Sequence, residues 1–206
     1  MSKLIIPPDY RPAMDVHQTE KAIKLVKDFF EVNLSTELRL TRVTAPLFVL
    51  KGTGINDDLY GIELPVSFQV LHMRDSGAEV VQSLAKWKRM KLADYDFPYG
   101  YGLYTDMNAI RPDVILDNTH SLYVDQWDWE RVITPAERNL EFLKKVVRKI
   151  YSILKRAKHY TFERYPGIQP ELPEEITFVH TEELRTCYPK LTPREREQRL
   201  LRECGA

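Results

Sequence analysis

Polar residues in the middle of the chain have the types and spacing of a ligand site. Arg111, in the segment IRPD, presents several N–H donors in a rigid fork that can clamp a phosphate or a carboxylate. Gln126 and Asp128 are two residues apart in HSLYVDQWDWE, so on an extended strand they face the same side. An acid and an amide on one face can hold an ammonium and a polar head group. The alternative is an exposed strand end with surface ion pairs, which stabilise a fold little, and spacing alone does not decide between the two.

A second group of polar residues lies in SLAKWKRMK, which begins at Ser83. Lys88 is four residues from both Leu84 and Leu92, so on a helix it lies near the apolar edge and could reach a carboxylate in a pocket. The alternative is that its aliphatic stem packs while the amine reaches water. A basic run with a tryptophan also suits nucleic acid, but acidic residues flank this one, and we do not favour that function.

Two further features are weak by themselves. Asp57 and Asp58 follow an asparagine in the glycine-bounded loop GTGINDDLYG, where acids usually form turns with their own backbone. His120 has no Cys or His nearby at metal-ligand spacing, so a structural role is favoured over a metal site. We therefore predict no metal ligands in this chain from spacing.

The composition limits the classes of function. Hydrophobic residues make up 43% and charged residues 29% of 206 residues, as in ordinary globular proteins. Lys plus Arg equals Asp plus Glu at 30 each, so no net charge favours nucleic acid. Two cysteines fit a reducing compartment, and no apolar run is long enough for a membrane span. No P-loop, Rossmann or nucleophile-elbow motif is present. We expect a cytoplasmic protein that binds neither nucleic acid nor a membrane.

These residues must be positioned by a mixture of helices and strands. Asp15 can cap an amphipathic helix that runs to about Leu34 and stops at Ser35, and Ser83 can cap a second helix. From His120 onward, alternation predicts a strand with Gln126 and Asp128 on one face and two tryptophans on the other. Thr134 with Glu137 forms a capping-box pattern before a long helix. The pattern predicts one α+β domain over residues 1–206, with a largely antiparallel sheet flanked by helices.

Five segments, taken in order, resemble one enzyme family. They are VTAPLFVLKGTGINDDLYG, EVVQSLAKWKR, GLYTDMNAIRPD, HSLYVDQWDWE and FVHTEEL, and they extend over almost the whole chain. The chain resembles the ammonia-dependent asparagine synthetases, also called aspartate-ammonia ligases. The resemblance implies a catalytic core similar to that of class II aminoacyl-tRNA synthetases, working as a homodimer. It also implies that ATP activates the β-carboxylate of L-aspartate as β-aspartyl-AMP with release of pyrophosphate, and that ammonia then displaces AMP to give L-asparagine.

The resemblance also assigns roles to residues. The first helix and the strand ending near Ala45-Pro46 resemble motif 1, which builds the dimer interface. IRPD resembles motif 2, in which Arg111 holds the α-phosphate and Asp113 lies near the adenine. The residues that fall where the family shapes its aspartate site are Asp57, Ser83, Lys88, Gln126 and Asp128. Of these, Lys88, Gln126 and Asp57 join Arg111 as catalytic candidates, and either Asp128 or Asp57 meets the substrate ammonium.

The family pattern continues beyond the last residues, LLRECGA. The resemblance implies further strands with the rest of the aspartate site, the acids that bind Mg²⁺, and a glycine-rich motif 3. We expect the chain to correspond to the N-terminal part of the family's catalytic domain and to show little or no catalysis alone. The alternative function is a truncated, non-catalytic paralogue that acts as a ligand-binding or dimerising module.

Overall fold

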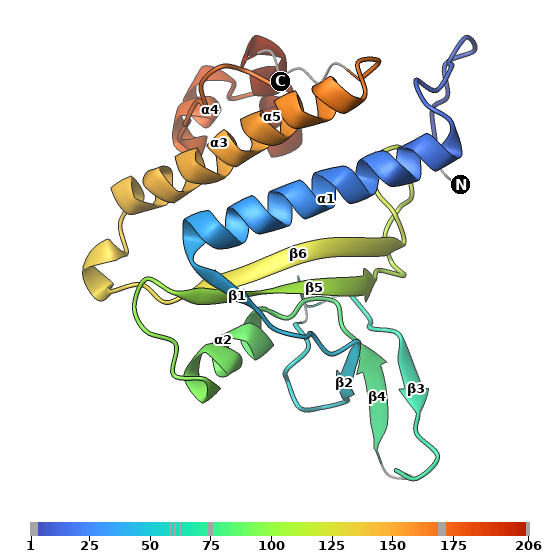
Figure 1. Cartoon of the computed structure of the whole chain (residues 1–206), viewed down its shortest axis with the longest axis vertical. Helices are drawn as coiled ribbons and strands as arrows, with labels where there is room; N and C mark the ends of the chain where they lie inside the picture. Colours follow the sequence, from blue (N-terminus) through green and yellow to red (C-terminus); the bar gives the residue numbers. More distant parts are fainter. Residues whose placement is uncertain are drawn as a thin grey trace. The chain divides into compact units, whose positions relative to one another are not determined.

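The computed structural model describes residues 4–57, 59, 61, 63–73, 76–168 and 172–204. The elements in chain order are α1 (Val16–Leu38), β1 (Leu40–Arg42), β2 (Phe48–Leu50), β3 (Ser67–Gln69), β4 (Gly77–Val80), α2 (Ala85–Asp94), β5 (Gly102–Ile110), β6 (Tyr123–Arg131), the 3-10 helix η1 (Pro135–Glu137), α3 (Leu140–Arg164), α4 (Thr181–Cys187) and α5 (Pro193–Cys204) (Figure 1). None of the helices in these ranges is long and apolar enough to cross a membrane.

The chain separates into two compact units. Unit 1 comprises Met1–Arg11 and Glu31–Asn139, and unit 2 comprises Pro12–Phe30 and Leu140–Ala206. All of the predicted site residues belong to unit 1. The prediction of one domain over residues 1–206 stays a prediction.

Helix α1 begins as predicted and ends later than predicted. The Asp15 carboxylate accepts a hydrogen bond from the Gln18 backbone N–H at 2.7 Å, and the Gln18 side chain accepts one from the Asp15 N–H at 3.2 Å. The predicted end at Leu34 is wrong. The hydroxyls of Ser35 and Thr36 both donate to the Val32 carbonyl, at 3.1 and 2.7 Å, so their side chains bond inside the helix instead of ending it.

The described residues of unit 1 form two small sheets. The first has the order β1-β5-β6, with β5 and β6 paired antiparallel along their whole length, from Gly102 opposite Arg131 to Ile110 opposite Tyr123. The second is antiparallel throughout, in the order β2-β4-β3. The predicted α+β class with flanking helices is confirmed. Among the described strands, the pair that departs from antiparallel pairing is β1 with β5, which run parallel.

Strand β6 confirms the predicted alternation but starts later than predicted. Asp128 pairs with Thr105 on β5, and Gln126 pairs with Met107. The predicted start at His120 is wrong, because the strand begins at Tyr123. The Asp117 carboxylate accepts hydrogen bonds from the backbone N–H groups of Thr119, at 2.8 Å, and His120, at 2.9 Å, and so holds the preceding residues in a turn.

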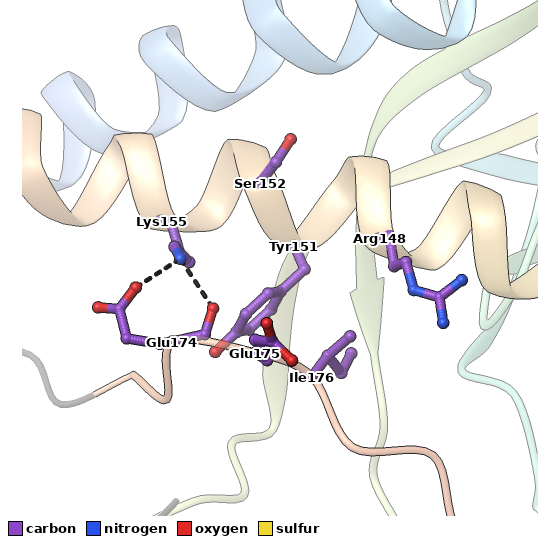
Figure 2. A pocket seen from close by; sticks show the side chains of 7 residues that line it. All are labelled: Arg148, Tyr151, Ser152, Lys155, Glu174, Glu175 and Ile176. Atoms are coloured by element: carbon purple, nitrogen blue, oxygen red, sulfur yellow. Dashed lines mark hydrogen bonds and ion pairs between the residues drawn. The ribbon is translucent and has the colours of Figure 1, made fainter.

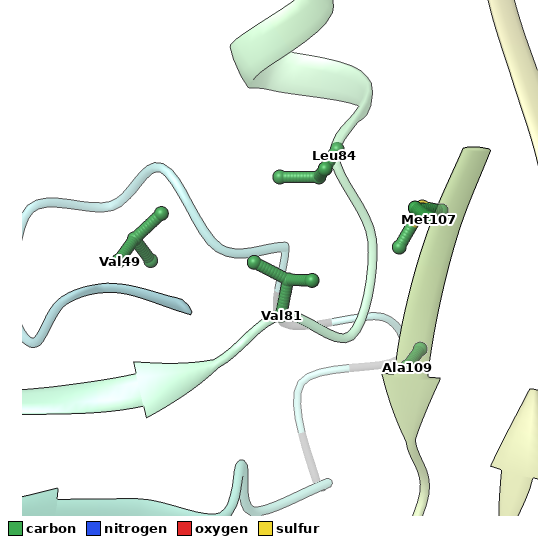
Figure 3. Packing of buried hydrophobic residues seen from close by; sticks show 5 residues of the cluster. All are labelled: Val49, Val81, Leu84, Met107 and Ala109. Atoms are coloured by element: carbon green, nitrogen blue, oxygen red, sulfur yellow. The ribbon is translucent and has the colours of Figure 1, made fainter. Parts of the chain in front are cut away.

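A small apolar cluster connects the two sheets with the start of α2. Its buried members are Val49, Val81, Leu84, Met107 and Ala109, and Figure 3 shows their side chains gathered between β4, α2 and β5. Trp87 and Val124 pack against the cluster from α2 and β6. The cluster therefore fixes α2 against the β5–β6 pair, on which two of the predicted site residues lie.

Unit 2 is helical. Phe29 of α1 stacks on Tyr160 of α3 with 4.8 Å between ring centroids, and Ile153 and Ala157 of α3 are buried. The predicted Thr134–Glu137 capping box, which lies at the end of unit 1, is present, but it opens the short helix η1, and α3 begins only at Leu140.

Candidate functional site

Asp57 caps helix α2 from a distant loop. One of its carboxylate oxygens accepts from the Ser83 hydroxyl at 2.9 Å and from the Ala85 backbone N–H at 3.2 Å. The predicted cap by Ser83 is wrong, because Leu84 occupies the N-cap position without a side-chain cap bond and the Ser83 hydroxyl turns to Asp57. The anionic partner of the helix N-terminus is therefore Asp57, a residue far from the helix in sequence.

Asn56 holds this loop in place. Its side-chain oxygen accepts from the Gln82 backbone N–H at 2.8 Å, and its side-chain nitrogen donates to the Val80 carbonyl at 3.1 Å. The next residue, Asp57, also lies 3.4 Å from the Lys86 ammonium. Asp58, beside it in the sequence, is outside the described residues.

Lys88 forms a buried ion pair across the space between α2 and β6. Its side chain is 1% exposed, and its ammonium contacts the Asp128 carboxylate, which is 28% exposed. One residue later, Arg89 pairs with Glu130 at 3.3 Å. The alternative in which the Lys88 amine reaches water is wrong. Asp128 pairs with this buried lysine, whereas Glu130, on the same strand face, pairs with the exposed Arg89.

Gln126 lies beside this pair on β6. Its side-chain nitrogen donates to the Met107 sulfur at 3.2 Å. Thioether sulfur is a weak acceptor, so this contact leaves the amide available for a stronger partner. Gln126 and Asp128 share the strand face that carries Glu130, which Arg89 of α2 contacts.

Arg111 follows β5 directly and lines a cavity of about 130 Å³. The cavity is also lined by Gln82, by the turn Pro112–Val114, and by Leu59 and Glu63. The buried Nε of Arg111 has no hydrogen-bond partner among the described residues. Asp113 accepts from the Leu64 backbone N–H at 3.0 Å and so fastens the segment that leads into β3 to this turn.

The structure brings the predicted residues together in three groups. Asp57 contacts Ser83, Lys88 contacts Asp128, and Arg111 and Asp113 line one cavity. Gln82 was missed by the sequence analysis. The available signal was a polar residue directly after the apolar pair Val80-Val81, where a strand leads into the core.

The described residues contain no group of three His, Cys, Asp or Glu side chains arranged to hold a metal ion. Mg²⁺ is a hard cation that takes several oxygen ligands. The described part of the site therefore does not form a complete Mg²⁺ site.

A second pocket, of about 360 Å³, lies in unit 2 along α3 (Figure 2). Lys155 of α3 bonds both the Glu174 carboxylate, at 2.9 Å, and the Glu174 carbonyl, at 2.8 Å. The hydrogen bond to the carboxylate, followed by the charge of Lys155, lowers the pKa of Glu174 below its ordinary value. The Tyr151 hydroxyl donates to the Pro173 carbonyl. These contacts tie the segment after α3 to the helix, and the pocket contains none of the predicted site residues.

Comparisons with known proteins agree on one family. A family profile described as aspartate-ammonia ligase matches residues 17–206. A Bacteroides thetaiotaomicron protein named aspartate–ammonia ligase is 60% identical over 206 residues, which is all of this chain and 60% of that protein. Proteins with the same name from Clostridium perfringens and Ruminiclostridium cellulolyticum are each 55% identical, over 100% and 98% of this chain and 61% and 60% of their own lengths. The chain thus spans about 60% of the length of these curated relatives.

Proposed function

The chain belongs to the aspartate-ammonia ligase family, and on that premise we propose that it builds the aspartate- and phosphate-binding part of an enzyme that makes L-asparagine. The reaction consumes L-aspartate, ammonia and ATP and releases AMP and pyrophosphate. The observation that carries the proposal is that buried Lys88 pairs with Asp128 and that Asp57 contacts Ser83. The resemblance assigns these four residues to the family's aspartate site.

Asp128 is our choice for the contact with the substrate ammonium. Both alternatives, Asp128 and Asp57, are partly exposed, but Asp57 already serves as a helix cap. Among the described residues, the cation that contacts Asp128 is Lys88, so a second cation can still bind its carboxylate. Gln126, on the same strand face, then donates from its amide to a carboxylate oxygen of aspartate.

Lys88 and Arg111 supply the positive charge for activation. In the first step an oxygen of the aspartate β-carboxylate attacks the α-phosphorus of ATP, and the bond to pyrophosphate breaks. Lys88 offsets the repulsion between this carboxylate and the triphosphate, and Arg111 stabilises the negative charge that builds on the phosphorus oxygens. In the second step the ammonia nitrogen attacks the acyl carbon, AMP leaves, and the ammonium formed loses a proton to give the amide.

Asp113 has a supporting role in this scheme. One carboxylate oxygen holds the Leu64 N–H, and the other can accept from the adenine amino group. Mg²⁺ would neutralise the phosphates when bound, and its acidic ligands are expected in the part of the family domain that lies beyond the last residues of this chain.

Both units belong, in this proposal, to a single class II synthetase-like catalytic domain that works as a homodimer. Apolar residues on the first half of α1 support an interface there, because Val16, Ile23 and Val26 are 80%, 50% and 36% exposed. Exposed apolar residues on one helix are typical of a surface that a partner covers.

The proposal is tested with the product of the complete gene. Purified protein is supplied with aspartate, ammonium and ATP, and AMP and asparagine are measured by chromatography. AMP formation should require both aspartate and ammonium, and Arg111→Ala should abolish it, whereas Arg194→Ala, an exposed arginine on α5, should not change it.

The same preparation separates the two candidate functions. Absence of asparagine with all three substrates present would refute the ligase. Calorimetric binding of aspartate or AMP without turnover would instead support the non-catalytic binding module. A folded protein that binds neither aspartate nor AMP would rule out both the ligase and the binding module.

A further inference from the structure

We propose that Gln82 is a second anion-binding residue of this site, and that Gln82 and Arg111 together hold one phosphoryl group of the nucleotide. The inference rests on the proposed function, which makes ATP the source of that group. It adds a residue to which neither the sequence analysis nor the family pattern used above assigns a role.

Gln82 is buried with a donor left over. Its side chain is 1% exposed, and its backbone N–H is satisfied by Asn56 at 2.8 Å. Its side-chain nitrogen has no hydrogen-bond partner among the described residues. Buried polar groups are nearly always hydrogen-bonded, so a buried amide with a free donor calls for a partner.

The Arg111 Nε is a second buried donor with the same property, and it lines the same cavity. The two donors come from different parts of the fold, because Gln82 follows β4 and Arg111 follows β5. Folding has therefore placed two unsatisfied donors at one cavity from segments far apart in sequence. Their common complement is a group that carries only acceptor oxygens.

The size of the cavity suits one phosphoryl group. A volume of about 130 Å³ equals that of roughly four liquid water molecules, which suits one tetrahedral anion. Glu63 and Asp113 also line the cavity, and their carboxylates repel a phosphate. We assign the phosphoryl oxygens to Gln82 and Arg111, and the hydroxyl or amino hydrogens of the nucleoside to the acids.

The neutral amide has a specific use beside Arg111. It adds a directed donor without adding charge, so it orients the phosphoryl group more than it attracts it. Replacing Gln82 with methionine keeps the length and removes the donor. Replacing it with glutamate places an anion where the phosphoryl oxygens would lie and gives Arg111 an internal partner, which should keep the fold intact.

The test measures AMP, inorganic phosphate and aspartate binding by calorimetry at fixed salt, with wild type, Gln82→Met and Gln82→Glu of the product of the complete gene. Loss of one hydrogen bond to a charged group should weaken AMP and phosphate binding about tenfold or more in Gln82→Met. Gln82→Glu should weaken both further. Aspartate affinity should stay within about twofold, since Gln82 donates to the phosphoryl group only. Thr161→Val, a buried polar-to-apolar exchange in unit 2, is the matched control and should bind all three ligands as wild type does.

A second measurement does not depend on how the variants fold. In wild-type protein labelled with ¹⁵N, the side-chain NH₂ signals of Gln82 should shift when AMP or phosphate is added. Unmoved signals at saturating AMP would overturn the inference, as would equal AMP affinity in wild type and Gln82→Met. Either result leaves the proposed function standing. Failure of wild type to bind AMP and aspartate at all would overturn the proposed function and this inference together.

Discussion

The ammonium of Lys88 on α2 contacts the carboxylate of Asp128 on β6, and the two side chains differ in their access to water. Lys88 is 1% exposed, whereas Asp128 is 28% exposed. A charge left alone is costly in proportion to its burial. The pair is therefore asymmetric, and the loss of stability should depend on which of its two members is removed.

Asp128→Asn should lower the free energy of unfolding by roughly 3 kcal/mol, because it leaves the buried Lys88 without an anion. Lys88→Met should cost about 1 kcal/mol, since Asp128 can still reach water. Urea unfolding of both variants measures the difference. Equal costs, or a larger cost for Lys88→Met, would contradict the buried pair. The exposed pair Lys24–Asp28 is a suitable control, because Asp28→Asn should change stability by less than about 0.5 kcal/mol.

Asp57→Ala should destabilise the chain by about 1 kcal/mol, the usual effect of losing a helix N-cap. The physical reason is that the Ala85 N–H and the Ser83 hydroxyl both lose their acceptor. Denaturant unfolding checks this value. Asp94→Ala, at the opposite end of α2, is the control, and its exposed contact with Lys91 should contribute little. If Asp57→Ala left the free energy of unfolding unchanged, the cap would have to come from another residue.

Gly102→Ala should be among the most destabilising single exchanges in unit 1. A Cβ at this position would lie 2.1 Å from the Glu130 carbonyl oxygen and 2.7 Å from the Arg131 Cα, so β5 and β6 would have to separate. We expect a loss of about 3 kcal/mol or more. Gly77→Ala, where the nearest atom is 3.2 Å away, should cost about 1 kcal/mol or less. Thermal unfolding of the two variants measures both losses of stability. Similar midpoints would refute the close approach of β5 and β6 at Gly102.

Tyr104 should make the stability of the chain fall at high pH. Burial, followed by the hydrogen bond that its hydroxyl donates to Glu31 at 2.7 Å, raises the pKa of Tyr104 from 10.0 to about 12. The folded state thus holds this proton more tightly than the unfolded state. This contribution to stability is present in full below pH 10 and is lost as the pH rises towards about 12. Tyr104→Phe should flatten that fall in urea titrations, while Tyr99→Phe, an exposed control, should leave it unchanged.

If the protein forms the proposed homodimer, a single substitution on α1 should halve its mass in solution. Ile23→Asp places a charge on the exposed apolar face of α1, so it should convert a dimer to a monomer at micromolar concentration. Light scattering after size exclusion measures the mass. Lys24→Asp, the adjacent and already polar position, is the control and should stay dimeric. A wild-type protein that is monomeric at all concentrations would refute the interface.

Local patterns in the sequence predicted most of the helices and strands. The Asp15 cap, the Thr134–Glu137 capping box and the alternation of β6 depend on residues close in the chain, and the structure contains all three. The errors came where a side chain found a different partner. Ser35 bonded within α1 instead of ending it, and Ser83 bonded Asp57 instead of capping α2.

The sequence by itself determined the family, the α+β class and the residue types of the site, because these follow from local composition and motif. Only the tertiary structure decided which charges are partners. Lys88 meets Asp128 and Asp57 meets the start of α2 across separations of tens of residues, and no periodicity encodes such distances. Gln82 illustrates the same limit: its buried, unsatisfied amide became visible only when the β4–α2 connection and the turn after β5 came to line one cavity.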